Sequence, residues 1–138
     1  MNDPQRLLRN SLRANGAFST LSGLVFSLGA GSVAPAIGLG DPRILVAVGV
    51  GLLGFAAFLF YVSSRPSVHL PTAMQIVWAD LAWVVGTVPL VLIGVLSREG
   101  VIAAIVVADI VLLFAVLQYL GVRRIRGEAP ASVRAATS

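Results

Sequence analysis

The chain has 138 residues, of which 57% are hydrophobic and 12% are charged, with a formal net charge of +4. Soluble domains carry about 25% charged residues, and a chain this short could not bury so much apolar surface in a single core. The composition therefore indicates a membrane protein. It excludes disulfides, thiolate chemistry and lysine Schiff bases, because the chain has neither cysteine nor lysine.

Four apolar runs follow one another along the chain, each close to the about 20 residues that an α-helix needs to cross the hydrocarbon core. They predict helices over residues 4–37, 44–62, 71–96 and 101–122. The expected fold is all-α, a four-helix transmembrane bundle arranged up-down-up-down with short loops. Residues 1–126 would form this single transmembrane domain, and the Ala- and Ser-rich residues 127–138 would form a flexible tail.

Prolines mark the breaks between the runs. Asp41 followed by Pro42 is typical of the N-cap and first turn of a helix, and Pro71 suits the start of the next one. Residues 97–100 have the composition of a tight turn before the last run. The loops are therefore expected to be short.

The first run has an alternative interpretation. Its arginine-rich start, its apolar stretch and the sequence Ala34-Pro35-Ala36 together resemble a signal peptide with its cleavage site. The apolar stretch is long for a signal peptide, and a proline beside the cleavage point is unfavourable. We therefore expect this run to stay in the protein as a transmembrane helix.

The arginines predict how the chain is oriented. Most of them lie in the N-terminal arm, between the second and third runs, or after the fourth run: Arg6, Arg9, Arg13, Arg65, Arg123, Arg124, Arg126 and Arg134. The other two loops hold Arg43 and Arg98, each close to an acidic residue. Because arginine and lysine are in excess on the cytoplasmic side of membrane proteins, we expect both termini to be cytoplasmic.

Small residues recur at four-residue steps in the first run and appear again in the second. This pattern lets helix backbones approach closely in lipid, where packing drives helix association. It predicts helix-packing positions at Ser19, Gly23, Ser27, Gly31, Gly51 and Gly54. The pattern fits packing inside the bundle, and it also fits a contact surface in a homo-oligomer.

Asp80 and Asp109 lie well inside apolar runs. A carboxyl near the middle of a bilayer costs about 3 kcal/mol or more, so each is expected to face the bundle interior. Helical spacing places Trp83 and Thr87 on the same side as Asp80, and depth places Ser22 near it. These five residues form the candidate intramembrane polar site.

The two acids allow two interpretations. The functional one is a proton or cation relay, or a site for a cationic ligand with Trp78 and Trp83 as aromatic walls. The structural one is a pair of buried acids whose hydrogen bonds to serine and threonine hydroxyls fix the helix register. The residues alone do not separate these interpretations.

Short stretches within residues 12–24, the segment 80–86 (DLAWVVG) and the ending 117–124 (LQYLGVRR) carry a resemblance. Together they resemble a group of small bacterial four-helix integral membrane proteins. The resemblance implies a multi-pass protein of the bacterial cytoplasmic (inner) membrane, and it implies no activity.

The expected function is that of a small accessory or scaffold protein that binds other membrane proteins or lipid. The alternative is a small proton- or cation-coupled transporter that uses Asp80 and Asp109. The chain has no recognisable nucleophile–base pair, metal-ligand cluster or phosphate loop, so catalysis, a metal and a cofactor are not expected. Its partners are expected to be the lipid bilayer, another membrane protein or a second copy of the chain, and not nucleic acid.

Overall fold

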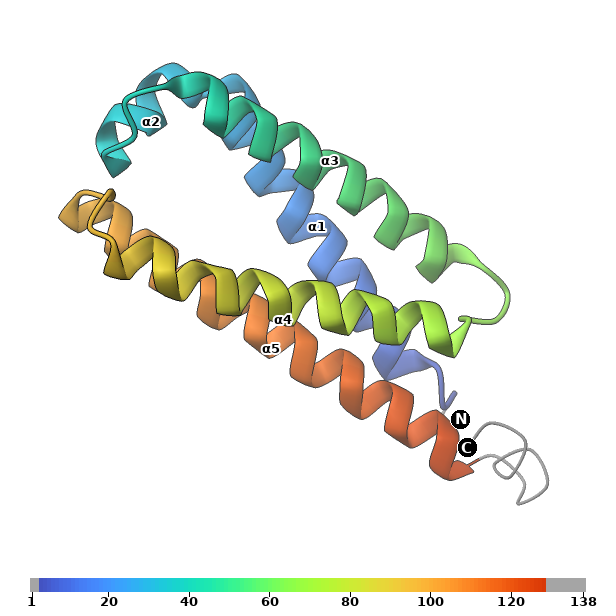
Figure 1. Ribbon diagram of the computed structural model, residues 1–138. Coiled ribbons are helices and arrows are strands. Elements are labelled where there is room, and N and C mark those ends of the chain that lie inside the picture. Colours follow the sequence, from blue (N-terminus) through green and yellow to red (C-terminus); the bar gives the residue numbers. More distant parts are fainter. Residues whose placement is uncertain (1–2, 129–138) are drawn as a thin grey trace.

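The computed structural model describes residues 3–128, and this part of the chain contains five α-helices and no strand. The helices are α1 (Arg6–Leu28), α2 (Ala30–Ile37), α3 (Pro42–Ser64), α4 (Leu70–Leu92) and α5 (Arg98–Glu128) (Figure 1). The all-α prediction is therefore confirmed. α5 continues beyond the predicted last helix, 101–122, and most of the predicted flexible tail, residues 129–138, lies outside the described residues.

Three helices of the described chain, α3, α4 and α5, are long and apolar enough to cross a membrane. α1 and α2 meet the same criterion only as a pair, and the pair is bent by 95°. The structure therefore offers three spanning helices in residues 3–128, or four if the bent pair is one span. These helices indicate a multi-pass membrane protein.

The first predicted helix, residues 4–37, is interrupted at Gly29. This residue leaves helical geometry (φ −100°, ψ 10°), and its N–H donates to the carbonyl of Val25. A Cβ atom there would lie 2.7 Å from that carbonyl oxygen, so a larger residue would not fit the bend. α2 then ends at Gly38, whose left-handed φ of 92° is accessible to glycine at little cost.

α3 and α4 begin where the proline pattern predicts. The Asp41 carboxylate caps α3 by accepting a hydrogen bond of 2.9 Å from the Arg43 N–H, and Pro42 occupies the first turn. The Arg43 guanidinium also pairs with Asp41 at 3.0 Å, and this side-chain hydrogen bonding lowers the pKa of the Asp41 carboxyl. Pro71 lies in the first turn of α4.

The long helices form two pairs. α1 packs along α3 and α4 packs along α5, and α1 also contacts α5, whereas α3 and α4 hardly touch each other. Figure 1 shows α3 and α4 running apart from their connecting loop. The end of the molecule that holds this loop, the start of α1 and the last turns of α5 is called the terminal end below.

Apolar side chains close the terminal end. They form one buried cluster that joins both helix pairs: Leu8, Leu12, Leu59, Val62, Val68, Ala73, Ile76 and Val122. At the opposite end, Ser97 precedes α5 and binds the end of α2. Its N–H donates to the Ile37 carbonyl at 2.9 Å and its hydroxyl to the Ala36 carbonyl at 2.8 Å. The two pairs are thus joined at both ends, and between the ends α1 still contacts α5 while α3 and α4 are apart.

The backbones of α1 and α3 approach closely at Gly23 and Gly49. A Cβ atom on Gly49 would lie 2.7 Å from the backbone nitrogen of Ser27 and 2.9 Å from the carbonyl oxygen of Gly23. The other predicted packing glycines have no atom within 4 Å of a Cβ placed on them: Gly31, Gly51 and Gly54. α3 therefore presents Gly49 to α1, in place of the predicted Gly51 and Gly54.

Candidate functional site

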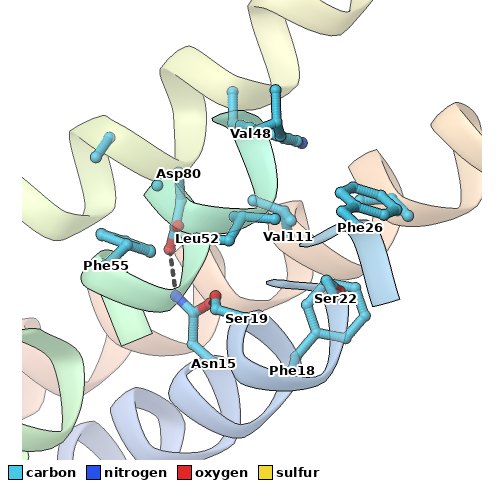
Figure 2. A pocket seen from close by; sticks show the side chains of 14 residues that line it. Asn15, Phe18, Ser19, Ser22, Phe26, Val48, Leu52, Phe55, Asp80 and Val111 are labelled. Carbon is cyan, nitrogen blue, oxygen red and sulfur yellow. Dashed lines mark hydrogen bonds between the residues drawn. The ribbon is translucent and has the colours of Figure 1, made fainter. Parts of the chain in front are cut away.

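Polar side chains form a buried layer in the middle of the bundle. Asn15 and Ser19 come from α1, Asp80 from α4 and Gln118 from α5, and none is more than 4% exposed. Asn15 Nδ2 donates a hydrogen bond of 2.8 Å to Asp80 Oδ2, which Figure 2 shows as a dashed line. The Ser19 hydroxyl points at Asn15 Oδ1 over a longer distance of 3.4 Å. Asn15 thus donates directly to the Asp80 carboxyl, and Ser19 supports the Asn15 amide from behind.

Gln118 is completely buried beside Asp80. Neither atom of its amide makes a hydrogen bond with the part of the chain that the structure describes, although the amide acts electrostatically on the Asp80 carboxyl. Leaving a buried polar group without a partner costs about 1–3 kcal/mol. The polar layer therefore has hydrogen-bonding capacity that the described chain does not use.

Asp80 also lacks a cationic partner. Among the side chains that the structure describes, the only ion pair is the one between Arg43 and Asp41, in the loop before α3. The Asp80 side chain is 3% exposed and lies about half-way along α4. A buried carboxylate without a counter-ion is strongly unfavourable. The carboxyl must therefore be protonated or meet a cation that is not part of the described chain.

An apolar layer lies directly beneath the polar one. Asn15, Asp80 and Gln118 each have a buried apolar neighbour about one turn toward the terminal end of their own helix. These neighbours are at most 1% exposed and belong to the terminal core: Leu12, Ile76 and Val122. The core therefore separates the polar layer from the terminal end.

On its other side, the polar layer faces a cavity of about 340 Å³. Apart from the polar layer its walls are mostly apolar and come from all four long helices: Phe18, Ser22, Phe26, Val48, Gly51, Leu52, Phe55, Ala79, Trp83, Val107 and Val111. Figure 2 shows Asp80 and Asn15 at this cavity with the aromatic rings of Phe18, Phe26 and Phe55 around it.

The mouth of the cavity lies between α3 and α4. The lining residues that are exposed are Gly51 on α3 and Ala79 and Trp83 on α4. These are the two helices that hardly touch. In a membrane this opening would face lipid, so a molecule dissolved in the bilayer could enter from the side.

The structure brings together part of the predicted polar site. Asp80, Ser22 and Trp83 line the cavity, whereas Thr87 and Asp109 lie in a second hollow, of about 280 Å³, between α4 and α5. The Thr87 hydroxyl donates to the Trp83 carbonyl at 2.8 Å. Asp109 is exposed and makes no hydrogen bond or ion pair with another described residue. The two acids therefore occupy different environments.

The predicted polar site omits three members of the polar layer: Asn15, Gln118 and Ser19, which was predicted as a helix-packing position. Asn15 precedes Ser19 by one step of the small-residue pattern, and Gln118 is the only amide in the run 101–122. Both signals are present in the sequence. Trp78, predicted as an aromatic wall, is 65% exposed and does not line the cavity.

The long apolar helices define the class, a multi-pass membrane protein, and they enclose a buried polar layer beside a cavity. No protein-family model matches the chain, and no curated protein or solved structure is significantly similar to it. The resemblance to small bacterial membrane proteins therefore assigns no family. Function has to be argued from the cavity itself.

Proposed function

We propose that this protein is a small accessory membrane protein that binds a membrane-embedded amphiphile, a lipid or lipid-like molecule, in the cavity between its helix pairs. The observation that supports this is a cavity with apolar walls, a polar floor at Asp80 and a mouth toward lipid. An amphiphile has the complementary form. The cavity volume of about 340 Å³ falls within the range of about 300–1,000 Å³ typical of ligand pockets.

The proposal treats α1 and α2 as one bent span, so that the chain crosses the membrane four times in an up-down bundle. Both termini then lie on one side, and the charges favour the cytoplasmic side for the terminal end. Exposed arginines gather there: Arg6, Arg13, Arg65, Arg123, Arg124 and Arg126. Both tyrosines of the chain lie against them, with Arg65 5.6 Å from the Tyr61 ring and Arg123 6.0 Å from the Tyr119 ring, and tyrosine is enriched at membrane interfaces. The bacterial inner membrane is the proposed location.

Single-cysteine labelling tests this orientation, because the natural chain has no cysteine. Ser67 is exposed in the loop between α3 and α4, and Gly40 is exposed in the loop before α3. We expect Ser67→Cys to react with a membrane-impermeant maleimide only in inside-out vesicles, and Gly40→Cys only in right-side-out vesicles. The reverse pattern, or labelling of both from the same side, would show the proposed orientation to be wrong.

Ligand binding is tested by filling the cavity. Gly51 lines it and has open space where a side chain would extend, whereas Gly54 is equally open but does not line it. We expect the parent protein, in dodecyl maltoside micelles that contain dodecanol, a single-chain amphiphile without a phosphate, to carry about one dodecanol per chain in native mass spectrometry. Gly51→Leu should lose this dodecanol because the leucine occupies its volume, and Gly54→Leu should retain it. Equal dodecanol content in the two variants, or none in the parent, would contradict the proposal.

A small proton- or cation-coupled transporter is the second candidate, favoured by a carboxyl at the floor of an open cavity. The apolar core beneath Asp80 and the separate position of Asp109 weigh against a relay through both acids. Proton or cation flux through reconstituted vesicles that Asp80→Asn abolishes would favour the transporter over the accessory role. Association with another membrane protein or with a second copy stays a prediction.

A further inference from the structure

We propose that the ligand is a lipophilic amine, with its ammonium group against Asp80 and its apolar chain or rings in the cavity above. This inference rests on the proposed function, since it names the chemical class of the amphiphile that the same cavity would bind.

The unpaired charge of Asp80 favours a cationic ligand. Asp80 is buried, it has no cation in residues 3–128, and it lines the cavity. Asn15 donates to one of its oxygens and so holds the carboxyl in place without neutralising it. A neutral amphiphile could add a hydrogen bond, but only a cation would compensate a carboxylate in this position. The missing charge is thus a property of the site that the ligand can supply.

The acceptor oxygens around the cavity floor also favour an ammonium group. An ammonium group is a donor only, and it needs several acceptor oxygens around it. Besides the Asp80 carboxyl, the cavity lining contains the hydroxyl oxygens of Ser19 and Ser22. Ser22 makes no hydrogen bond with another described residue. The floor therefore offers the Asp80 carboxyl and the nearby Ser19 hydroxyl to a compact donor, and Ser22 adds a hydroxyl further along the wall.

The aromatic lining of the cavity favours a cation that carries an apolar chain. Phe18, Phe26, Phe55 and Trp83 line the cavity. Phe18 is itself packed against Phe114, with ring centroids 5.8 Å apart, which holds its ring at the wall. Aromatic faces attract cations within about 6 Å, and they also pack well against apolar chains. An amine with an apolar body uses both properties.

A phospholipid headgroup fits this floor less well than a simple amine. Asp80 lies ten residues into α4, which at about 1.5 Å per residue is about 15 Å from the helix start. A phosphatidylethanolamine headgroup would have to sink to that depth and would bring its negative phosphate close to the carboxylate. Repulsion between the two anions would oppose binding. The proposal therefore commits to an amine without a phosphate.

The test compares two probes with the same chain, tritiated dodecylamine and tritiated dodecanol, by scintillation proximity with the full-length protein in dodecyl maltoside micelles at neutral pH. We expect the parent to bind dodecylamine at least about tenfold more tightly than dodecanol, a difference of about 1.4 kcal/mol. Asp80→Asn should remove this preference. Asp109→Asn, which neutralises a carboxyl outside the cavity, should keep it. Gly51→Leu should weaken both probes.

The parent protein alone decides the inference even if Asp80→Asn does not fold, because the amine and the alcohol are compared on the unmodified chain. Equal affinity of the parent for both probes, with Gly51→Leu weakening both, would overturn the amine inference and leave amphiphile binding standing. No saturable binding of either probe would overturn both. Displacement of dodecylamine by dihexanoyl-phosphatidylethanolamine at equal concentration would also overturn the inference, because the site would then accept a phosphate-bearing headgroup.

Discussion

Gly49→Ala is expected to lower the free energy of unfolding by about 1–3 kcal/mol, the usual cost of overpacking a tight contact. The new methyl group would lie 2.7 Å from the backbone nitrogen of Ser27 and 2.9 Å from the Gly23 carbonyl oxygen. Both are backbone atoms, which cannot rotate away as a side chain can. α1 and α3 would therefore have to separate at their crossing, which lies beside the cavity wall formed by Ser22 and Val48.

Gly51→Ala is the matched control for Gly49→Ala. Gly51 lies two residues further along the same helix, and a Cβ there would meet nothing within 4 Å. Its replacement should change stability by less than about 0.5 kcal/mol, or raise it slightly because alanine favours helix. Unfolding by sodium dodecyl sulfate in mixed micelles measures both variants. Equal midpoints for the two would show that the close crossing at Gly49 is absent in the membrane protein.

The contact between α1 and α3 shows which packing residues the sequence predicts and which it does not. The four-residue pattern in the first run identifies Gly23 and Ser27, because they share one face of α1 whatever surrounds it. The partner on α3 is not determined in the same way. α3 is apolar on all sides, so its sequence does not indicate how the helix is rotated about its axis. Gly51 and Gly54 were plausible partners, and the structure uses Gly49.

For the same reason, the sequence did not predict which polar residues meet in the candidate site. Asp80 and Asp109 both stand out in apolar runs, but only contacts between helices decide which face of α4 or α5 is buried. Asp80 is at 3% exposure and Asp109 is exposed. Asn15 and Gln118 carry no charge, so neither stands out within its helix until the fold brings both next to Asp80. The position of a residue along its helix is thus predictable from the sequence, and its neighbours on other helices are not.

The bend between α1 and α2 also depends on contacts between distant parts of the chain, which the sequence does not reveal. The apolar stretch after Ala14 is long enough for a straight span, and glycine is tolerated inside membrane helices. What selects Gly29 as the break is the contact of α2 with its neighbours: Ala30 and Ala34 pack on Leu45 of α3, and Ile37 binds Ser97. These contacts join distant parts of the chain. They close the end of the molecule opposite the terminal end.

Arg9→Ala is expected to lower the free energy of unfolding by about 2–3 kcal/mol, because hydrogen bonds to a charged group contribute about 1.5–3 kcal/mol each and are not additive. The Arg9 guanidinium donates to the carbonyls of Ser63 and Arg65 at 2.6 and 2.7 Å, and to that of Pro66 at 3.3 Å. These carbonyls belong to the end of α3 and its following loop, where the chain has no helical donors left. Arg9 thus connects α1 to the loop between α3 and α4 through hydrogen bonds.

Two further variants separate this geometric role of Arg9 from its charge. Arg9→Lys keeps the charge but loses the planar fork that reaches several carbonyls, so it should recover only part of the lost stability. Arg13→Ala removes an exposed arginine that makes no hydrogen bond or ion pair with another described residue, and it should cost less than about 0.5 kcal/mol. Because the loop sets how far α3 and α4 diverge, Arg9→Ala should also weaken amphiphile binding in the native mass spectrometry assay. If Arg9→Ala and Arg13→Ala unfold at the same concentration of dodecyl sulfate, Arg9 acts only through its charge, and the tie between α1 and the loop does not stabilise the fold.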